Sequence, residues 1–393
     1  VTRFPPSSAA AEAAAAAVGP LYARSGSAAL ITSSVETLAG LRAAEALRED
    51  PASFQDVFEE ELDAIRRLQD GVGGAGGSAS GGGTSGGASG GAGEEEQPLE
   101  AIDDATSMQR RLSEFLAGAP RADAPGRALS ELLHLKVIHG FQHRRMPLVP
   151  PLTHLEDGAA SLGGAEPRRL VEGLYSEEAL ALVRDHVMGI IGEWDHLVRE
   201  YPLQISLFQA GQVYAVSSLF GYSLRRADAR YQLEKMASGS RAGGREAKNL
   251  AEYVADFGPE EAKQMATIAS LEAEQAMERQ FSAVFGNIVE LQQELLRALD
   301  LPPEAGAEGA VDQGLIHERL REAVARGEVA SVRLSVSELR RLALEGCAFG
   351  FLLGAAEAEA DSACELSPGL AECPVARMSR QVEKGLKFTA FRL

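Results

Sequence analysis

The chain has 393 residues, with 38 basic and 57 acidic side chains and a formal net charge of −19 at pH 7. Phosphate backbones and anionic lipid surfaces repel such an excess of acid, which argues against nucleic-acid partners and against attachment to a membrane by charge. Three cysteines without a CxxC pair are too few for a disulfide framework, and no apolar stretch has the roughly 20 residues of a membrane span.

The N-terminal part divides into three segments by composition. Residues 1–34 are rich in alanine and serine and poor in acid, which predicts a disordered leader of transit-peptide type, although an Ala-rich leader without that role has the same composition. In the N-terminal helical segment 35–70, apolar side chains at helical spacing predict a helix over Phe54–Gln69 that docks on its own domain or binds a partner. Residues 71–98 are dominated by glycine and serine and are predicted to be a flexible linker.

A helical domain is expected over residues 99–360, followed by a C-terminal tail at 361–393. Its first strong helix starts near Arg127, and Ser176 can cap the next one, whose apolar stripe runs to Leu197. The segment Leu203–Met236 is the longest apolar-rich one and carries several small residues on one face, so it is predicted to be the central helix of a bundle.

The remaining elements follow from local patterns. A short helix is expected from Leu250 to Phe257, one continuous stripe from Pro259 to Gly286, and a helix over Asn287–Leu299. Alternating residues at 328–336 predict a short strand, paired with Lys387–Arg392. The last helix starts with a capping box and carries three glycines four residues apart, typical of a groove for a neighbouring helix: Ser335 and Glu338, then Gly346, Gly350 and Gly354.

These elements predict an all-α fold, a multi-helix bundle around a central apolar helix, with room for one short β-hairpin near the C-terminus.

Four histidines cluster in sequence: His134, His139, His143 and His154. His139 and His143 would share a helix face, as metal ligands can, but two arginines follow His143 directly and oppose a bound cation.

Two Glu-x-x-His pairs of the kind that di-iron bundles use occur at Glu131/His134 and Glu193/His196. Helical periodicity turns Glu131 and His196 away from the apolar faces of their helices, toward solvent. We therefore predict no metal site and no cofactor.

The cysteines give little sign of catalysis. Cys347 lies in an apolar run, where a buried thiol is inert, while Cys364 and Cys373 could form a redox bridge in the tail. The GxSxG matches fall only within the Gly-rich linker, where no strand–turn–helix unit can form. Whether the protein is an enzyme stays open, with the balance against it.

One polar cluster stands out as a candidate anion or partner site: Arg225, Arg226, Arg230 and Lys235. The simpler interpretation, which we favour, is pairing within the helix, Arg230 with Glu234 and Arg225 with Asp228. The alternative function would be binding or catalysis of a small anionic ligand by the three arginines.

The same segment, GQVYAVSSLFGYSLRRADARYQLEK at 211–235, closely resembles a signature of the UV-B-induced chloroplast protein family of plants, algae and cyanobacteria, a family of unknown molecular function. ALSELLHLKVIHGFQ from Ala128, LYSEEALALVRDHVMGIIG from Leu174 and LSVSELRRLALEGCAFGFLLGAAEAEAD from Leu334 resemble other family helices, in the same order. The chain departs from the family in its Gly-rich linker and in the tail after Asp361.

The resemblance implies a non-enzymatic stromal protein of the chloroplast that acts through protein partners in stress response or proteostasis, as a substrate or interactor of the Clp protease system. No catalytic residues are established for the family, so none are carried over to this chain.

Overall fold

The computed structural model describes residues 35–73, 124–152, 162, 167–192, 202–238, 249–299, 313–369 and 375. Helices dominate these residues, and one two-stranded sheet accompanies them, so the predicted all-α class is confirmed. The leader 1–34 and most of the Gly-rich segment lie outside the described residues.

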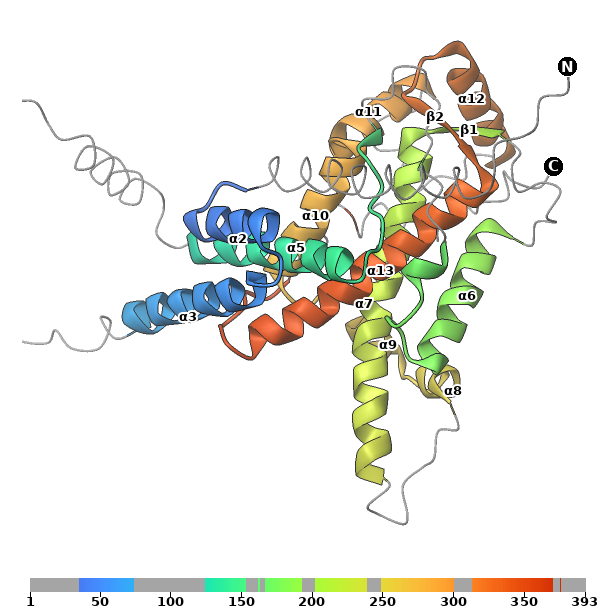
Figure 1. The fold of residues 1–393 in the computed structure, drawn as a ribbon. Helices are drawn as coiled ribbons and strands as arrows, with labels where there is room; N and C mark the ends of the chain where they lie inside the picture. Colours follow the sequence, from blue (N-terminus) through green and yellow to red (C-terminus); the bar gives the residue numbers. More distant parts are fainter. Residues whose placement is uncertain are drawn as a thin grey trace, which may run out of the picture.

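Two long helices cross at the centre of the fold, α7 (Leu207–Ser238) and α13 (Val336–Asp361) (Figure 1). They run in the same direction, because their contacts advance by four residues on both. A Cβ added at Gly346 would lie 2.8 Å from the carbonyl oxygen of Tyr214, and one at Gly354 would lie 3.4 Å from that of Tyr222. At Gly350, between them, it would overlap the backbone of Ser218. The glycines therefore let the two backbones touch, as their spacing predicted.

On one side of this crossing, α5 (Ala124–His143) packs against α10 (Leu271–Phe285) and α13. Two N-terminal helices, α2 (Leu38–Glu49) and α3 (Phe54–Gly73), cover the outside of α5 (Figure 1). The predicted amphipathic helix thus docks on its own chain and buries Phe54, Phe58, Leu62 and Ile65.

On the other side, the short helix η3 (Pro167–Leu170) and α6 (Glu177–Ile191) pack against α13, and α6 also contacts α7. Ser176 caps α6 as predicted, with its hydroxyl accepting a hydrogen bond from the Ala179 N–H. The helix ends at Ile191, because Gly192 takes a positive φ of 83°, and the rest of the predicted stripe to Leu197 lies outside the described residues.

The stripe from Pro259 to Gly286 forms two helices, not one: α9 (Pro259–Ala266) and α10. The chain extends at Thr267, and the Ser270 hydroxyl starts α10 by accepting from the Ala273 N–H. Before this pair lies α8 (Leu250–Ala255), and after it come α11 (Ile288–Ala298) and α12 (Gln313–Arg326), the last of which the sequence pattern did not predict.

The small sheet joins β1 (Pro202–Ser206) to β2 (Ser331–Ser335) in antiparallel register, with Ile205 opposite Val332. The predicted strand at 328–336 is confirmed, and its partner among the described residues is β1. Lys387–Arg392 lie outside those residues, so the pairing with them stays a prediction. β1 leads directly into α7 and β2 into α13, so the sheet fixes where the two central helices start.

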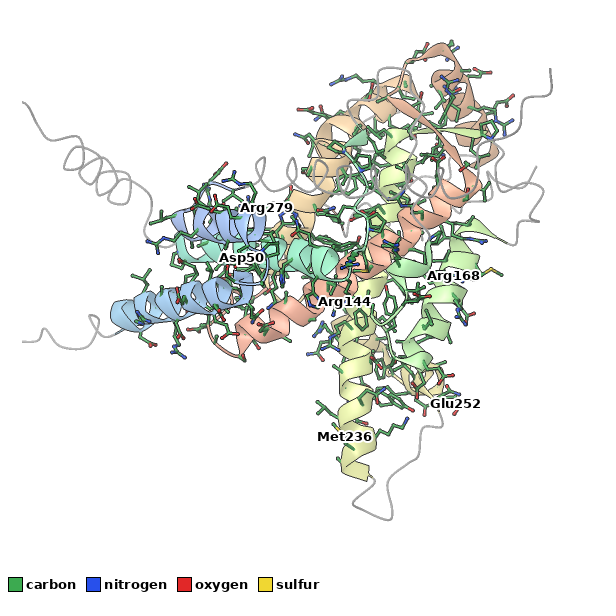
Figure 2. All side chains as sticks on the ribbon, viewed as in Figure 1. Asp50, Arg144, Arg168, Met236, Glu252 and Arg279 are labelled. Atoms are coloured by element: carbon green, nitrogen blue, oxygen red, sulfur yellow. The ribbon has the colours of Figure 1, made fainter. Side chains whose placement is uncertain are left out.

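The C-terminal third of α7 extends away from the crossing, and Figure 2 shows Met236 near its free end. Across the part of the chain that is described, none of the helices combines the length and the apolar character needed to cross a membrane.

Candidate functional site: buried polar groups and an acidic groove

A chain of polar side chains crosses the core from α5 through α10 to α7. His134 Nε2 lies 3.0 Å from Gln280 Oε1, and the Gln280 amide donates to the Tyr214 hydroxyl at 3.2 Å. Burial lowers the pKa of His134 to about 4, so this ring is neutral at pH 7 and its Nε2–H is the donor to Gln280. The side-chain amide can accept from one neighbour while it donates to the other, which explains a glutamine at this position.

Glu345 of α13 lies close to this row of polar side chains. Burial is the main cause of the raised pKa of Tyr214, and the charge of Glu345 is the second. The Glu345 side chain is fully buried, and neither carboxyl oxygen has a hydrogen-bond partner among the described residues. Burial raises its pKa to about 7, while Arg341, one turn earlier, and the Val149 backbone oppose that rise. This carboxyl therefore changes protonation near neutral pH.

A second buried carboxyl, Glu357, is fully bonded. It accepts from the Tyr222 hydroxyl at 2.6 Å, from the Ser270 N–H at 3.0 Å, and from the Ser270 hydroxyl. The Tyr222 oxygen in turn accepts from the Ala269 N–H at 2.8 Å. This cluster ties the N-terminus of α10 to both central helices.

Glu131 is a third buried carboxyl, 1% exposed, and it binds the start of α2. It accepts from the N–H groups of Glu36 and Thr37 at 3.1 and 3.0 Å and from the Thr37 hydroxyl at 2.5 Å. Arg279 of α10, where α2, α5 and α10 meet (Figure 2), lies 3.4 Å from the same carboxylate. An anion at a helix N-terminus is stabilising.

The expectation that Glu131 points to solvent is therefore wrong, and His134 is just as buried. The periodicity argument assumed one buried face, whereas α5 is covered by α2, α3, α10 and α13 together.

His139 and His143 do share a face, with ring centroids 6.0 Å apart, and His139 stacks on Phe54. Within the described residues, no group of three or more His, Cys, Asp or Glu side chains could hold a metal ion. His154, Glu193 and His196 lie outside those residues.

The two described cysteines are both buried and reduced. Burial raises the pKa of the Cys347 thiol well above its usual range, which makes it a poor nucleophile. The Cys364 thiol donates to the Leu62 carbonyl at 3.1 Å. Cys373 lies outside the described residues, so a bridge to Cys364 stays a prediction.

The basic cluster of α7 contacts its neighbours. Arg226 donates to the carbonyls of Gln264 and Thr267 at the end of α9, at 3.0 and 2.9 Å. Arg230 pairs with Glu234, as predicted, and also with Glu261 of α9 at 2.5 Å.

The other two cations of the cluster reach different helices. Lys235 binds Glu178 of α6 at 3.2 Å, and Arg225 lies over the Phe351 ring of α13. Asp228 does not pair with Arg225 but accepts from the Ser176 hydroxyl. These contacts favour a structural role for the cluster.

A concave surface lies between α2 and α3. We call it the acidic groove; its lining is Arg42, Glu45, Ala46, Glu49, Asp50, Ser53, Val57, Glu60 and Glu61. Five carboxylates thus face one guanidinium, and Arg42 is already paired with Glu61 at 3.1 Å. On the same helix α2, Leu38 and Leu41 are 50% and 53% exposed. The groove is therefore acidic, and the two leucines add exposed apolar area elsewhere on α2.

Comparison with known proteins supports the predicted resemblance. Residues 123–237 match the model of a family described as a protein of unknown function, DUF760. The chain is 26% identical to the UV-B-induced protein At3g17800, chloroplastic, of Arabidopsis thaliana over 298 residues. That match covers 65% of this chain and 63% of the relative, less than two thirds of the relative's length. No solved structure matches the chain significantly. Over residues 123–237, from α5 to the end of α7, the chain therefore shows the resemblance to the DUF760 family that its sequence predicted.

Proposed function

We propose that this is a non-enzymatic protein of the chloroplast stroma that acts through protein partners in stress response or proteostasis, as a substrate or interactor of the Clp protease system. The chloroplast assignment is supported by the Arabidopsis relative, whose name places it in that organelle and describes it as UV-B-induced.

The acidic groove between α2 and α3 is the observation that carries the partner-binding part of the proposal. It is concave, it is lined by five carboxylates, and two half-exposed leucines lie on α2. Such a surface fits a basic segment of another protein that also carries apolar side chains, since charge steers the encounter and apolar contact adds affinity. By contrast, Cys347 and His134, two groups that could do chemistry, are fully enclosed in the core.

Affinity purification of the tagged protein from isolated chloroplasts, with and without inhibition of Clp, tests the proposal. We expect a defined set of proteins to be enriched, and Clp inhibition to raise either the abundance of the protein or its recovery with Clp subunits. If no protein is enriched over an untagged control and abundance is unchanged by the inhibitor, the proposal is wrong.

A further inference from the structure

Glu345 differs from Glu131 and Glu357, two other buried carboxylates, in its hydrogen bonding. Glu131 and Glu357 each accept several hydrogen bonds, whereas both oxygens of Glu345 lack a hydrogen-bond partner among the described residues. Burial of an ionised carboxylate without partners is strongly unfavourable, so the folded core favours the protonated form. Buried polar groups without partners are rare in native structures and call for an explanation.

The groups that face Glu345 are few. On its own helix, Arg341 contributes a positive charge, and on α7 the Tyr214 hydroxyl is close enough to be affected by the carboxylate. His134 of α5 is connected to Tyr214 through hydrogen bonds of the Gln280 side chain of α10. The charged side chains of η3 and β2 are exposed: Arg168, Arg169 and Arg333. On α6, His186 is stacked on Phe220, and Glu338 of α13 accepts from the Leu162 N–H.

The remaining neighbour is a loop, Met146–Leu152, which follows α5 and brings the Val149 backbone to the Glu345 carboxyl. The Val149 backbone N–H is directed at the Glu345 carboxyl and favours its charged form without completing a hydrogen bond. The loop packs through three buried side chains, Met146, Val149 and Leu152. It has no regular hydrogen-bonded structure before Leu152, so it is the neighbour of Glu345 that can move at least cost.

We propose that Glu345 and the loop Met146–Leu152 form a pH-sensitive latch, in which the protonated carboxyl allows the loop to close over α13 and loss of its proton to water opens the loop. Once ionised, the carboxylate gains hydrogen bonds only if water enters, and water enters by displacing the Val149 region of the loop. The proton passes to solvent, and no covalent bond is formed.

The size of the effect follows from linkage. With a pKa of about 7 in the closed state and the ordinary value of 4.5 when solvated, the opening equilibrium of the loop increases about tenfold between pH 6 and pH 8. This increase in opening is confined to the loop and the part of α13 that it contacts. Backbone amides in the rest of the core keep their protection against hydrogen exchange.

Hydrogen exchange of the intact chain at pH 6 and pH 8, corrected for the intrinsic pH dependence of amide exchange, tests the latch. In the wild type, the four amides of the loop, at Met146, Leu148, Val149 and Leu152, should lose about tenfold in protection from pH 6 to pH 8, as the linkage requires. Glu345→Gln, which cannot ionise, should show equal protection at both values. Asp361→Asn, which removes an exposed carboxylate of the same helix, should keep the wild-type response. Equal protection at both pH values in the wild type, or the same change in Glu345→Gln, would overturn the proposal.

A second measurement does not depend on any variant folding. Carbon-13 NMR of the side-chain carboxyl groups in the wild type should show one glutamate that titrates near pH 7, in step with the change in loop protection. If every glutamate titrates below pH 6, the latch does not exist.

Discussion

Tyr222 of α7 donates a 2.6 Å hydrogen bond to Glu357 of α13, inside the interface where the two central helices touch. The same phenol oxygen accepts from the Ala269 N–H, just before α10. One hydroxyl thus connects three helices, and it is bonded on both its donor and its acceptor side. Burial of this kind raises the cost of removing either partner.

We expect Tyr222→Phe to lower the free energy of unfolding by about 2 kcal/mol, because one oxygen of the buried Glu357 carboxylate and the Ala269 N–H both lose the hydroxyl that they bond to. Chemical denaturation measures the change. Tyr175→Phe is the matched control, since the Tyr175 hydroxyl is buried but has no hydrogen-bond partner among the described residues. It should change stability by less than about 0.5 kcal/mol. Equal losses in the two variants would contradict this account of the cluster.

At the crossing of α7 and α13, Gly350→Ala should destabilise the fold by about 3 kcal/mol, because the new Cβ would overlap the backbone of Ser218 and force the helices apart. Thermal and chemical unfolding check this. Gly189, exposed on α6, has nothing within 4 Å of an added Cβ. There, alanine should stabilise by about 0.5 to 1 kcal/mol, through its better helix propensity. A tolerated Gly350→Ala would show that the two backbones do not touch.

Because Glu131 binds the N-terminus of α2, replacing it should destabilise α2 locally as well as lower the stability of the whole fold. Glu131→Ala removes the acceptor of the Glu36 and Thr37 N–H groups and leaves Arg279 beside an empty site, with an expected cost of about 3 kcal/mol. Hydrogen exchange should show the amides of α2 losing protection before those of α13. Glu278→Ala, on the exposed face of α10, should change stability by less than about 0.5 kcal/mol. Uniform loss of protection throughout the chain would argue against a local role.

Glu345 also predicts how stability depends on pH. Its pKa rises from 4.5 in the unfolded chain to about 7 in the folded one, so the folded state binds the proton more tightly. The resulting stabilisation is complete below pH 4.5 and is lost as pH rises to 7, by about 3 kcal/mol in total. In Glu345→Gln this contribution should disappear, which denaturation of both proteins between pH 4.5 and 8 would reveal as a flatter curve. Parallel curves would contradict the assignment.

Local signals in the sequence predicted much of the fold. The capping residues Ser176 and Ser335, the proline that opens α9 and the glycines of α13 have local physical meanings, and the structure uses each of them as expected. The partner of β2 could not be found in this way, because the pairing of Ile205 with Val332 joins segments far apart in sequence.

The buried polar groups were missed for a related reason. Glu131 looked solvent-exposed because helical periodicity cannot show that a helix is covered on all sides. Glu345 had a visible signal, a single acid directly before the apolar run Gly346–Ala356, but nothing local shows whether such an acid is paired. For the basic cluster, spacing predicted Arg230–Glu234, while the contacts of Arg226 with α9 depend on tertiary packing.

The most direct test of the central claim compares what the wild type and an acidic-groove variant recover from chloroplast extract. Glu45→Gln, Glu49→Gln and Glu60→Gln together remove three exposed charges of the groove, and the control removes three exposed charges elsewhere, with Glu260→Gln, Glu278→Gln and Glu318→Gln. If the groove binds the partner, the groove variant loses the proteins that the wild type enriches, while the control variant retains them. Unchanged enrichment by the groove variant would contradict the account.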